Sequence, residues 1–196
     1  MSDDIIEIRW HGRGGQGAIT AAKIVAEAAF RSGYGGAIMA PTFGTERRGA
    51  PVHTSLKIAH HKINDLSPIE TPDIVVVLDH MIMSEVDVTA GLKPGGLLVL
   101  NTPRPLDRCL RDGLRVAVAP INQIAEQAGL RRGIVNSGII GTFGRASGLM
   151  DLEILADCIE REFAGKRPKE NAEAARQAWQ QTEISSAQPT LASTGM

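Results

Sequence analysis

The sequence predicts an α/β protein: a Rossmann-like, mostly parallel sheet with an antiparallel hairpin addition and C-terminal helices. Three observations lead to this fold class. Continuous β-branched runs, the pattern of strands buried on both faces, occur in the middle of the chain. Stretches with helical periodicity lie between them, which is the order expected of βαβ units. A glycine-rich turn joins the first strand to the first helix, as in nucleotide-binding sheets.

The first third of the chain is predicted to contain two strands, one helix and a hairpin. The first strand is expected at 5–10 and ends at a glycine cluster, and the helix is expected at 20–31, before the stop signal Ser32-Gly33. A short strand is expected at 37–40. Alternation of apolar and polar residues predicts that 52–58 and 61–63 form the antiparallel hairpin.

The rest of the chain alternates strands and helices and then becomes helical. Strands are expected at 74–78, 95–101 and 116–119, with short helices at 81–90 and 121–128 between and after them. Three further helices are expected at 134–149, 152–163 and 171–181, and the small residues of the first of these predict a close approach of backbones. We predict one domain at 1–182, followed by a flexible C-terminal tail at 183–196, which is rich in Ser, Thr, Ala, Gln and Pro.

Composition and charge exclude several classes of protein. A chain of 196 residues with 43% hydrophobic residues can bury one substantial core. A net charge of −1 argues against a nucleic-acid partner. The apolar runs are far shorter than the ~20 residues of a membrane span, and the N-terminus has no signal-peptide pattern, so a cytoplasmic protein with no membrane partner is predicted. Cys109 and Cys158 are isolated, so we expect no metal or iron–sulfur site in this chain.

The glycine-rich turn is the first candidate binding site. Its glycines satisfy the G-x-G-x-x-G pattern of dinucleotide-binding proteins, but no acidic residue follows about 20 residues later to bind a ribose. This disfavours a dinucleotide and leaves two interpretations: close packing of strand, turn and helix, or binding the phosphates of a nucleotide-like thioester carrier. The candidate residues are Gly12, Arg13, Gly14, Gly15, Gln16 and Gly17.

A second charged loop is expected to lie beside the first, at the carboxyl edge of the sheet. It contains Glu46, Arg47 and Arg48. The two arginines suit a phosphate or a carboxylate, and Glu46 suits an arginine. The alternative is an internal ion pair that fixes a glycine-rich loop.

Together the two loops resemble a known family. The runs Arg9-Trp10-His11-Gly12-Arg13-Gly14-Gly15-Gln16-Gly17 and Phe43-Gly44-x-Glu46-Arg47-Arg48-Gly49-Ala50-Pro51 are similar to the γ subunit of 2-oxoacid:ferredoxin oxidoreductases. The likeness continues through Ser67-Pro68-Ile69, Asn136-Ser137-Gly138-x-x-Gly141 and Asn171, and covers roughly residues 4–180. The residues of these two runs are most similar to the pyruvate/ketoisovalerate-type branch of the family, except at Thr45, where that branch usually has Pro.

The resemblance implies a division of labour within an enzyme complex. The complex would decarboxylate a 2-oxoacid with coenzyme A (CoA) to an acyl-CoA and CO2. Thiamine diphosphate, Mg and [4Fe-4S] clusters are expected in partner subunits, of α, β and ferredoxin-like δ type; a flavin/NAD subunit is a further candidate partner. The chain itself would hold no cofactor and no catalytic residue. It would contribute to assembly and, through the two loops, to CoA access.

Two alternatives stay open. One is a stand-alone dinucleotide-binding oxidoreductase, and the other is a purely structural assembly module. For two individual residues, His11 and Asp79, the sequence also allows two interpretations each. His11 is expected to orient the glycine loop by a hydrogen bond rather than to transfer a proton, and Asp79 is placed either for function or to cap the helix that follows it. The sequence does not decide which 2-oxoacid, which electron acceptor or which stoichiometry applies.

Overall fold

A computed structural model describes residues 5–41 and 48–185 of the chain. Its centre is a seven-stranded sheet of order β2-β3-β1-β4-β5-β6-β7. Strands β1, β4, β5 and β6 are parallel to one another; β3 runs antiparallel to β1 and β2, and β7 runs antiparallel to β6. The strands are β1 (Ile6–Arg13), β2 (Gly36–Pro41), β3 (Pro51–Ala59), β4 (Ile74–Val77), β5 (Leu97–Asn101), β6 (Arg115–Ala119) and β7 (Glu183–Ile184).

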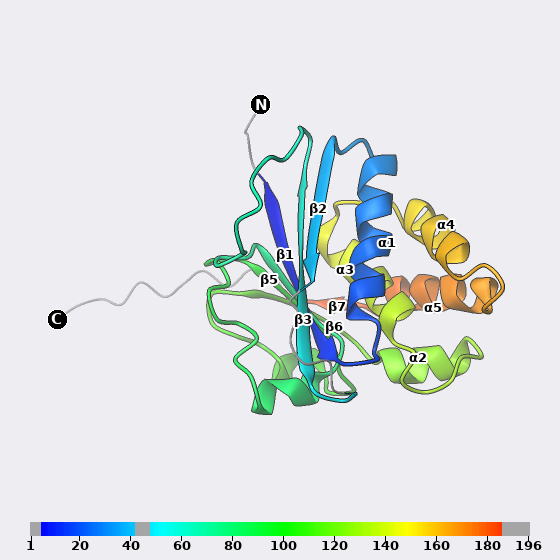
Figure 1. The fold of residues 1–196 in the computed structure, drawn as a ribbon. Helices are drawn as coiled ribbons and strands as arrows, with labels where there is room; N and C mark the ends of the chain where they lie inside the picture. The colour runs from blue at the N-terminus through cyan, green and yellow to red at the C-terminus, as the bar shows by residue number, and fades with distance from the viewer. Residues whose placement is uncertain (1–4, 42–47, 186–196) are drawn as a thin grey trace.

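The α-helices gather on one face of the sheet, whereas short turns cover the other face (Figure 1). The helices are α1 (Ala18–Arg31), α2 (Ile121–Gln127), α3 (Asn136–Ser147), α4 (Leu152–Glu162) and α5 (Pro168–Gln181), and the 3₁₀ turns are η1 (His80–Ser84) and η2 (Leu106–Arg108). The predicted fold class is confirmed. Of these helices, none is long and apolar enough to cross a membrane.

The central strands are buried on both faces, as their continuous β-branched sequences predict. Val76 and Val99 face the helices, where they join a core that includes Trp10 and Phe143. Val75 and Leu98, the neighbouring residues along each strand, face the opposite side and join a second, smaller core. Because successive side chains of a strand point to opposite faces, such a strand needs apolar residues at every position.

Three of the expected elements differ in the structure. The antiparallel addition is the pair β2–β3, and residues 61–63 form no strand. The helix expected at 81–90 is only the 3₁₀ turn η1, followed by further turns. The tail was expected to leave the domain at residue 183, but Glu183 and Ile184 pair with β6, and the Ser185 amide donates a hydrogen bond to the Val116 carbonyl over 2.8 Å. The remainder of that tail, 186–196, lies outside the described residues.

Helix α3 packs very closely against its neighbours, as its small residues predict. A Cβ atom added at Gly141 would lie 2.0 Å from the carbonyl oxygen of Ala175 in α5. One added at Gly138 would lie 2.5 Å from a methyl group of Ile121, the first residue of α2. The backbones of α3 and α5 therefore meet without an intervening side chain.

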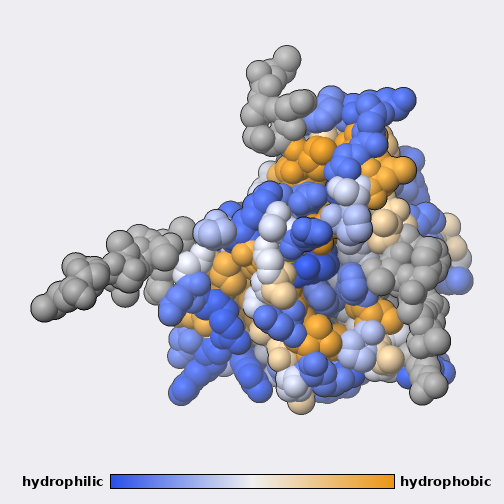
Figure 2. Space-filling view, turned by 60° about the vertical axis from the view of Figure 1, so that its left-hand side comes forward, coloured by the Kyte–Doolittle hydropathy of each residue, from blue (hydrophilic) through white to orange (hydrophobic). Residues whose placement is uncertain are grey.

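The surface is polar with scattered apolar positions. Figure 2 shows one face, where hydrophobic patches interrupt a largely hydrophilic surface. The large hydrophobic side chains that are exposed among the described residues include Ile19, Phe30, Leu66, Met81, Val86, Leu110 and Ile134. Scattered exposure of this kind is ordinary in a folded protein.

The strand order reverses direction between β1 and β4. From β1 the chain passes through α1 on the helical face to β2 at one edge, whereas from β4 it passes through turns on the opposite face to β5 and β6. In open α/β sheets, ligands bind at the carboxyl ends of the strands where such a reversal occurs. The glycine-rich turn follows β1, and Asp79 follows β4, so both lie at this position.

Candidate functional site: two joined loops at the sheet edge

The glycine-rich segment begins inside β1 rather than after it. The strand was expected to end at Trp10 but continues to Arg13, so that Gly12 pairs with Val52 of β3. The turn proper is Gly14–Gly17. It is closed by two hydrogen bonds between Arg13 and Gln16: the Gln16 amide donates to the Arg13 carbonyl (2.9 Å), and the Arg13 amide donates to Gln16 Oε1 (2.7 Å).

Two of the glycines are required by the backbone. Gly15 has φ = 92° and Gly17 has φ = 82°, in the left-handed region that favours glycine. Gly15 is also exposed, with no atom within 4 Å of the place where a Cβ would stand. The backbone of this turn is therefore accessible from solvent at Gly15.

The second loop is hydrogen-bonded to the first, and the expectation that the two loops are neighbours is confirmed. The Gly14 amide donates to the Ala50 carbonyl over 2.9 Å, and the Gly49 amide donates to the Gly14 carbonyl over 3.1 Å. Arg48 is exposed and makes no ion pair with any described residue. Glu46 and Arg47, the other candidates of this loop, lie outside the described residues.

Arg13 fastens the glycine turn to the segment after β4. Its guanidinium donates to Asp79 Oδ2 (2.8 Å), Glu85 Oε1 (2.6 Å) and the Gly49 carbonyl (3.1 Å). The hydrogen bonds to Glu85 and then to Asp79 raise the pKa of Arg13, so its charge is permanent. These partners engage all three guanidinium nitrogens, so Arg13 positions the loops and is not a free anion-binding group.

Asp79 caps the turn that follows it, which is one of the two interpretations of the sequence, and it also pairs with Arg13. Its Oδ2 accepts from Arg13, and its Oδ1 accepts from the Met81 amide (3.0 Å), which caps η1. Burial alone would raise the pKa of this carboxyl, but the hydrogen bonds from Arg13 and Met81 hold it below the ordinary value.

The N-terminus of α1 is an anion-attracting feature of the site. The N-cap is Gly17, no side chain caps the helix, and the first turn contains no acidic residue. The amide nitrogen of the Asn136 side chain lies close by, 2.8 Å from where a Cβ on Gly17 would be. No described residue accepts a hydrogen bond from it, whereas Asn136 Oδ1 accepts from the Ser137 amide (3.1 Å). Uncapped amides and a free amide donor favour a negatively charged group here.

His11 lies beneath the site and is neutral. Only 6% of it is exposed, and its Nε2 accepts a hydrogen bond from Arg9 Nε over 3.1 Å. Burial, and then the charges of Arg9 and His53, lower the pKa of His11 to about 3. The hydrogen bond that the sequence predicted therefore goes to Arg9 rather than to the loop itself, and Arg9 in turn donates to the carbonyls of Val88 and Ala90.

The two cysteines and strand β2 supply neither a metal-ligand cluster nor a ribose-binding acid among the described residues. There, no group of three or more His, Cys, Asp or Glu side chains is placed to hold a metal ion. Cys109 and Cys158 are buried, and burial raises the pKa of both thiols. Strand β2 holds no acidic residue that could bind a ribose.

Fold and site together define a Rossmann-like α/β module that presents two joined loops where the strand order of its sheet reverses. Comparison with known proteins gives the family. The sequence pattern of the family described as "Pyruvate ferredoxin/flavodoxin oxidoreductase" matches residues 7–181, and the chain belongs to this family, as a γ-type subunit. The resemblance seen in the two loops is thereby confirmed.

Relatives and solved structures agree with this assignment. The pyruvate/ketoisovalerate oxidoreductases common subunit gamma of Thermococcus litoralis is 44% identical over 186 residues, which are 92% of this chain and 98% of the relative. The crystal structure of pyruvate oxidoreductase subunit PORC from Thermotoga maritima superimposes with a TM-score of 0.79 at 32% identity, covering 93% of this chain and 99% of that one.

A third structure shares the fold. It is 2-oxoglutarate:ferredoxin oxidoreductase from Magnetococcus marinus with 2-oxoglutarate, coenzyme A and succinyl-CoA bound, with a TM-score of 0.69 at 20% identity. The match covers 91% of this chain and 30% of that one. The present chain thus corresponds to one part of that longer protein.

Sequence reasoning found the two loops but missed two residues of the site. Glu85 holds Arg13 from 72 residues away, and no pattern in the sequence indicates this pairing. Asn136 belongs to a motif that carries the family resemblance, yet its place beside Gly17 is visible only in the structure.

Proposed function

We propose that the chain works within a thiamine diphosphate- and iron–sulfur-dependent complex that converts a 2-oxoacid and CoA to an acyl-CoA and CO2. Its own role is assembly and CoA access. The observation that carries the second role is the uncapped N-terminus of α1, preceded by a glycine turn that is hydrogen-bonded to the loop containing the exposed Arg48. Pyruvate and ketoisovalerate are the proposed 2-oxoacids, because the similar subunit of Thermococcus litoralis is named for them.

The chemistry of CoA suits this edge of the sheet. CoA carries a diphosphate and a further phosphate, which favour backbone amides at a helix N-terminus and arginine side chains. Gly15 leaves the backbone open to close approach, and Asn136 adds a neutral donor. The shared fold of the Magnetococcus marinus enzyme, which was solved with CoA bound, supports the same proposal.

The redox and decarboxylation chemistry is assigned to partner subunits of α, β and ferredoxin-like δ type. They would hold thiamine diphosphate, Mg and the [4Fe-4S] clusters, as the family resemblance implies. Within the described part of this chain, we assign Arg13, Asp79 and Glu85 to holding the two loops in place.

Replacing Arg48 tests the proposed CoA route. In the intact complex, Arg48→Gln should raise KM for CoA about tenfold, which is the value of one lost charge-assisted hydrogen bond. KM for the 2-oxoacid should change less than about twofold, because that substrate is bound in partner subunits on this proposal. Steady-state kinetics with each substrate varied in turn provides the measurement.

The matched control is Arg161→Gln, which removes the same charge from α4, away from the sheet edge. Equal changes in both KM values, or no change in either, would favour the purely structural role. Binding of NAD or NADH by the chain alone would favour a dinucleotide-dependent oxidoreductase instead.

A further inference from the structure

A second cavity lies next to the two loops, beyond the carboxyl ends of β4 and β5. Its volume is about 260 Å³, and it lies between η1 on one side and the segment from Thr102 to Arg111 on the other. Asp79, which holds Arg13, directly precedes His80 in the cavity wall. The cavity is therefore adjacent to the proposed CoA loops but is lined by different residues.

The cavity is strongly cationic. Arg104, Arg108 and Arg111 line it, and no acidic residue does. The guanidinium of Arg104 makes no hydrogen bond or ion pair with any described residue. Arg111 donates from Nη1 to the carbonyls of Cys109 and Leu110, which leaves its Nη2 and Nε available. Arg108 forms an exposed ion pair with Asp107 over 4.0 Å. The positive charges of Arg104 and Arg111 are therefore the ones that no ion pair compensates within the described residues.

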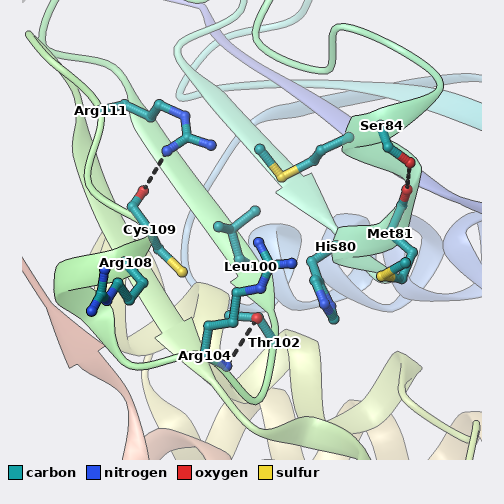
Figure 3. Close-up of a pocket in the computed structure, with 10 residues that line it drawn as sticks. His80, Met81, Ser84, Leu100, Thr102, Arg104, Arg108, Cys109 and Arg111 are labelled. Carbon is teal, nitrogen blue, oxygen red and sulfur yellow. Dashed lines mark hydrogen bonds between the residues drawn. The ribbon is translucent and has the colours of Figure 1, made fainter.

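The side chains converge on the cavity, as Figure 3 shows. Arg111 and Cys109 lie on one side, His80 and Met81 lie on the other, and Leu100 lies between them. The guanidinium of Arg104 extends in front of Leu100 toward His80, whereas Arg108 stands at the outer rim. Leu100 is 2% exposed, so the base of the cavity is apolar, and an apolar base strengthens the attraction between charged groups.

We propose that this cavity binds a phosphate group. Guanidinium groups match the oxygens of a phosphate with paired, planar donors, and two arginines that approach from one segment offer two such forks. A volume of 260 Å³ is below the range of whole drug-sized ligands and suits a phosphate with a short extension. Burial raises the pKa of Cys109, so its thiol stays neutral and does not repel an anion.

Two sources of phosphate share this chemistry. One is inorganic phosphate or a small phosphorylated metabolite, which would make the cavity an independent site. The other is one of the phosphates of a CoA molecule held at the neighbouring loops, and this source rests on the proposed function. Both sources of phosphate would bind to the same two arginines. Replacing these arginines therefore tests whether the site exists, and comparing two titrants tests which source occupies it.

The experiment is a titration of the full-length, nitrogen-15-labelled chain followed by NMR. Sodium phosphate, added at constant ionic strength, should shift the Nε–H signals of Arg104 and Arg111 and the amides of the segment between them, in a saturable way. Arg104→Gln and Arg111→Gln should each weaken phosphate binding about tenfold, the effect of one charge-assisted hydrogen bond. Both side chains are exposed, so the fold is expected to survive each change. Arg161→Gln on α4 should leave the binding unchanged.

A parallel titration with CoA separates the sources. If CoA shifts the cavity signals together with those of Gly14–Gly17, and both responses saturate at the same concentration, the phosphate belongs to CoA. If phosphate alone shifts the cavity signals, the site serves a free ligand, whatever happens to the kinetics of Arg48→Gln. The proposal is overturned if neither titrant shifts the cavity signals, or if the double variant Arg104→Gln/Arg111→Gln responds like the wild type.

Discussion

Replacing Gly141 with alanine should lower the free energy of unfolding by about 3 kcal/mol, the upper end of what overpacking a close-packed interior usually costs. The added methyl group would stand 2.0 Å from the carbonyl oxygen of Ala175, so α3 and α5 would have to separate. Backbone atoms cannot move aside as a side chain does. For a chain of this length the melting temperature should fall by about 10 °C, measured by thermal and urea unfolding of the full chain.

Gly138→Ala is the matched control in the same helix. Its added methyl group would meet Ile121 Cγ2 at 2.5 Å, and a single side chain can shift more easily than a helix backbone, so a smaller loss, about 1 kcal/mol, is expected. If Gly141→Ala cost no more than Gly138→Ala, the backbone contact between α3 and α5 would not exist in solution.

Acidification should destabilise the chain through His11. In the unfolded chain this imidazole takes up a proton near its ordinary pKa of 6.5, whereas in the folded protein its pKa is lowered to about 3. Between these values the unfolded state binds more protons, so stability falls as the pH falls. The loss is about 1.4 kcal/mol per pH unit, or roughly 2 kcal/mol between pH 6.5 and pH 5 for this residue alone. Urea unfolding at a series of pH values measures it.

The variant His11→Gln separates the effect of protonation on stability from the effect of side-chain packing. Glutamine keeps an acceptor for Arg9 but does not titrate, so the variant should be less stable near neutral pH and should lose less stability on acidification. Since His53 also has a lowered pKa, some dependence on pH will remain. Parallel curves for the wild type and His11→Gln would show that His11 is protonated in the folded state.

The sequence was most informative where one local pattern determines the structure. The β-branched runs at 74–78 and 116–119 have enough apolar residues for two faces, and both became central strands. Apolar periodicity located α1 and α4 to within two residues at each end. In these segments the local preference and the packing agree.

The hairpin was assigned to the wrong arms because its formation depends on a contact between distant residues. Gly35 and Gly36 have no side chain, and a Cβ on either would lie 2.5 Å from the carbonyl oxygen of His60 or His61. The chain after β3 therefore crosses closely over these glycines instead of returning as a strand, and β2 occupies the edge of the sheet. Alternation within 52–63 contains no information about that crossing.

The helix expected at 81–90 failed for a local reason that the apolar spacing did not reveal. Asp87 Oδ1 accepts hydrogen bonds from both the amide (3.0 Å) and the hydroxyl group (2.7 Å) of Thr89. Such a side-chain turn offers the backbone an alternative to the helix. Glu85 then lies free of a regular helix and reaches Arg13, which is why the partner of the glycine turn was not apparent from sequence.

The single carboxylate of Asp79 has a consequence for both edges of the candidate site. One oxygen accepts from the guanidinium of Arg13, and the other accepts from the amide of Met81, which follows His80 in the cavity wall. If an occupant on either side shifts this carboxylate, the affinity of the opposite side changes as well, and thermodynamic reciprocity makes the factor equal in both directions. Communication across this short bridge would require no movement of the sheet.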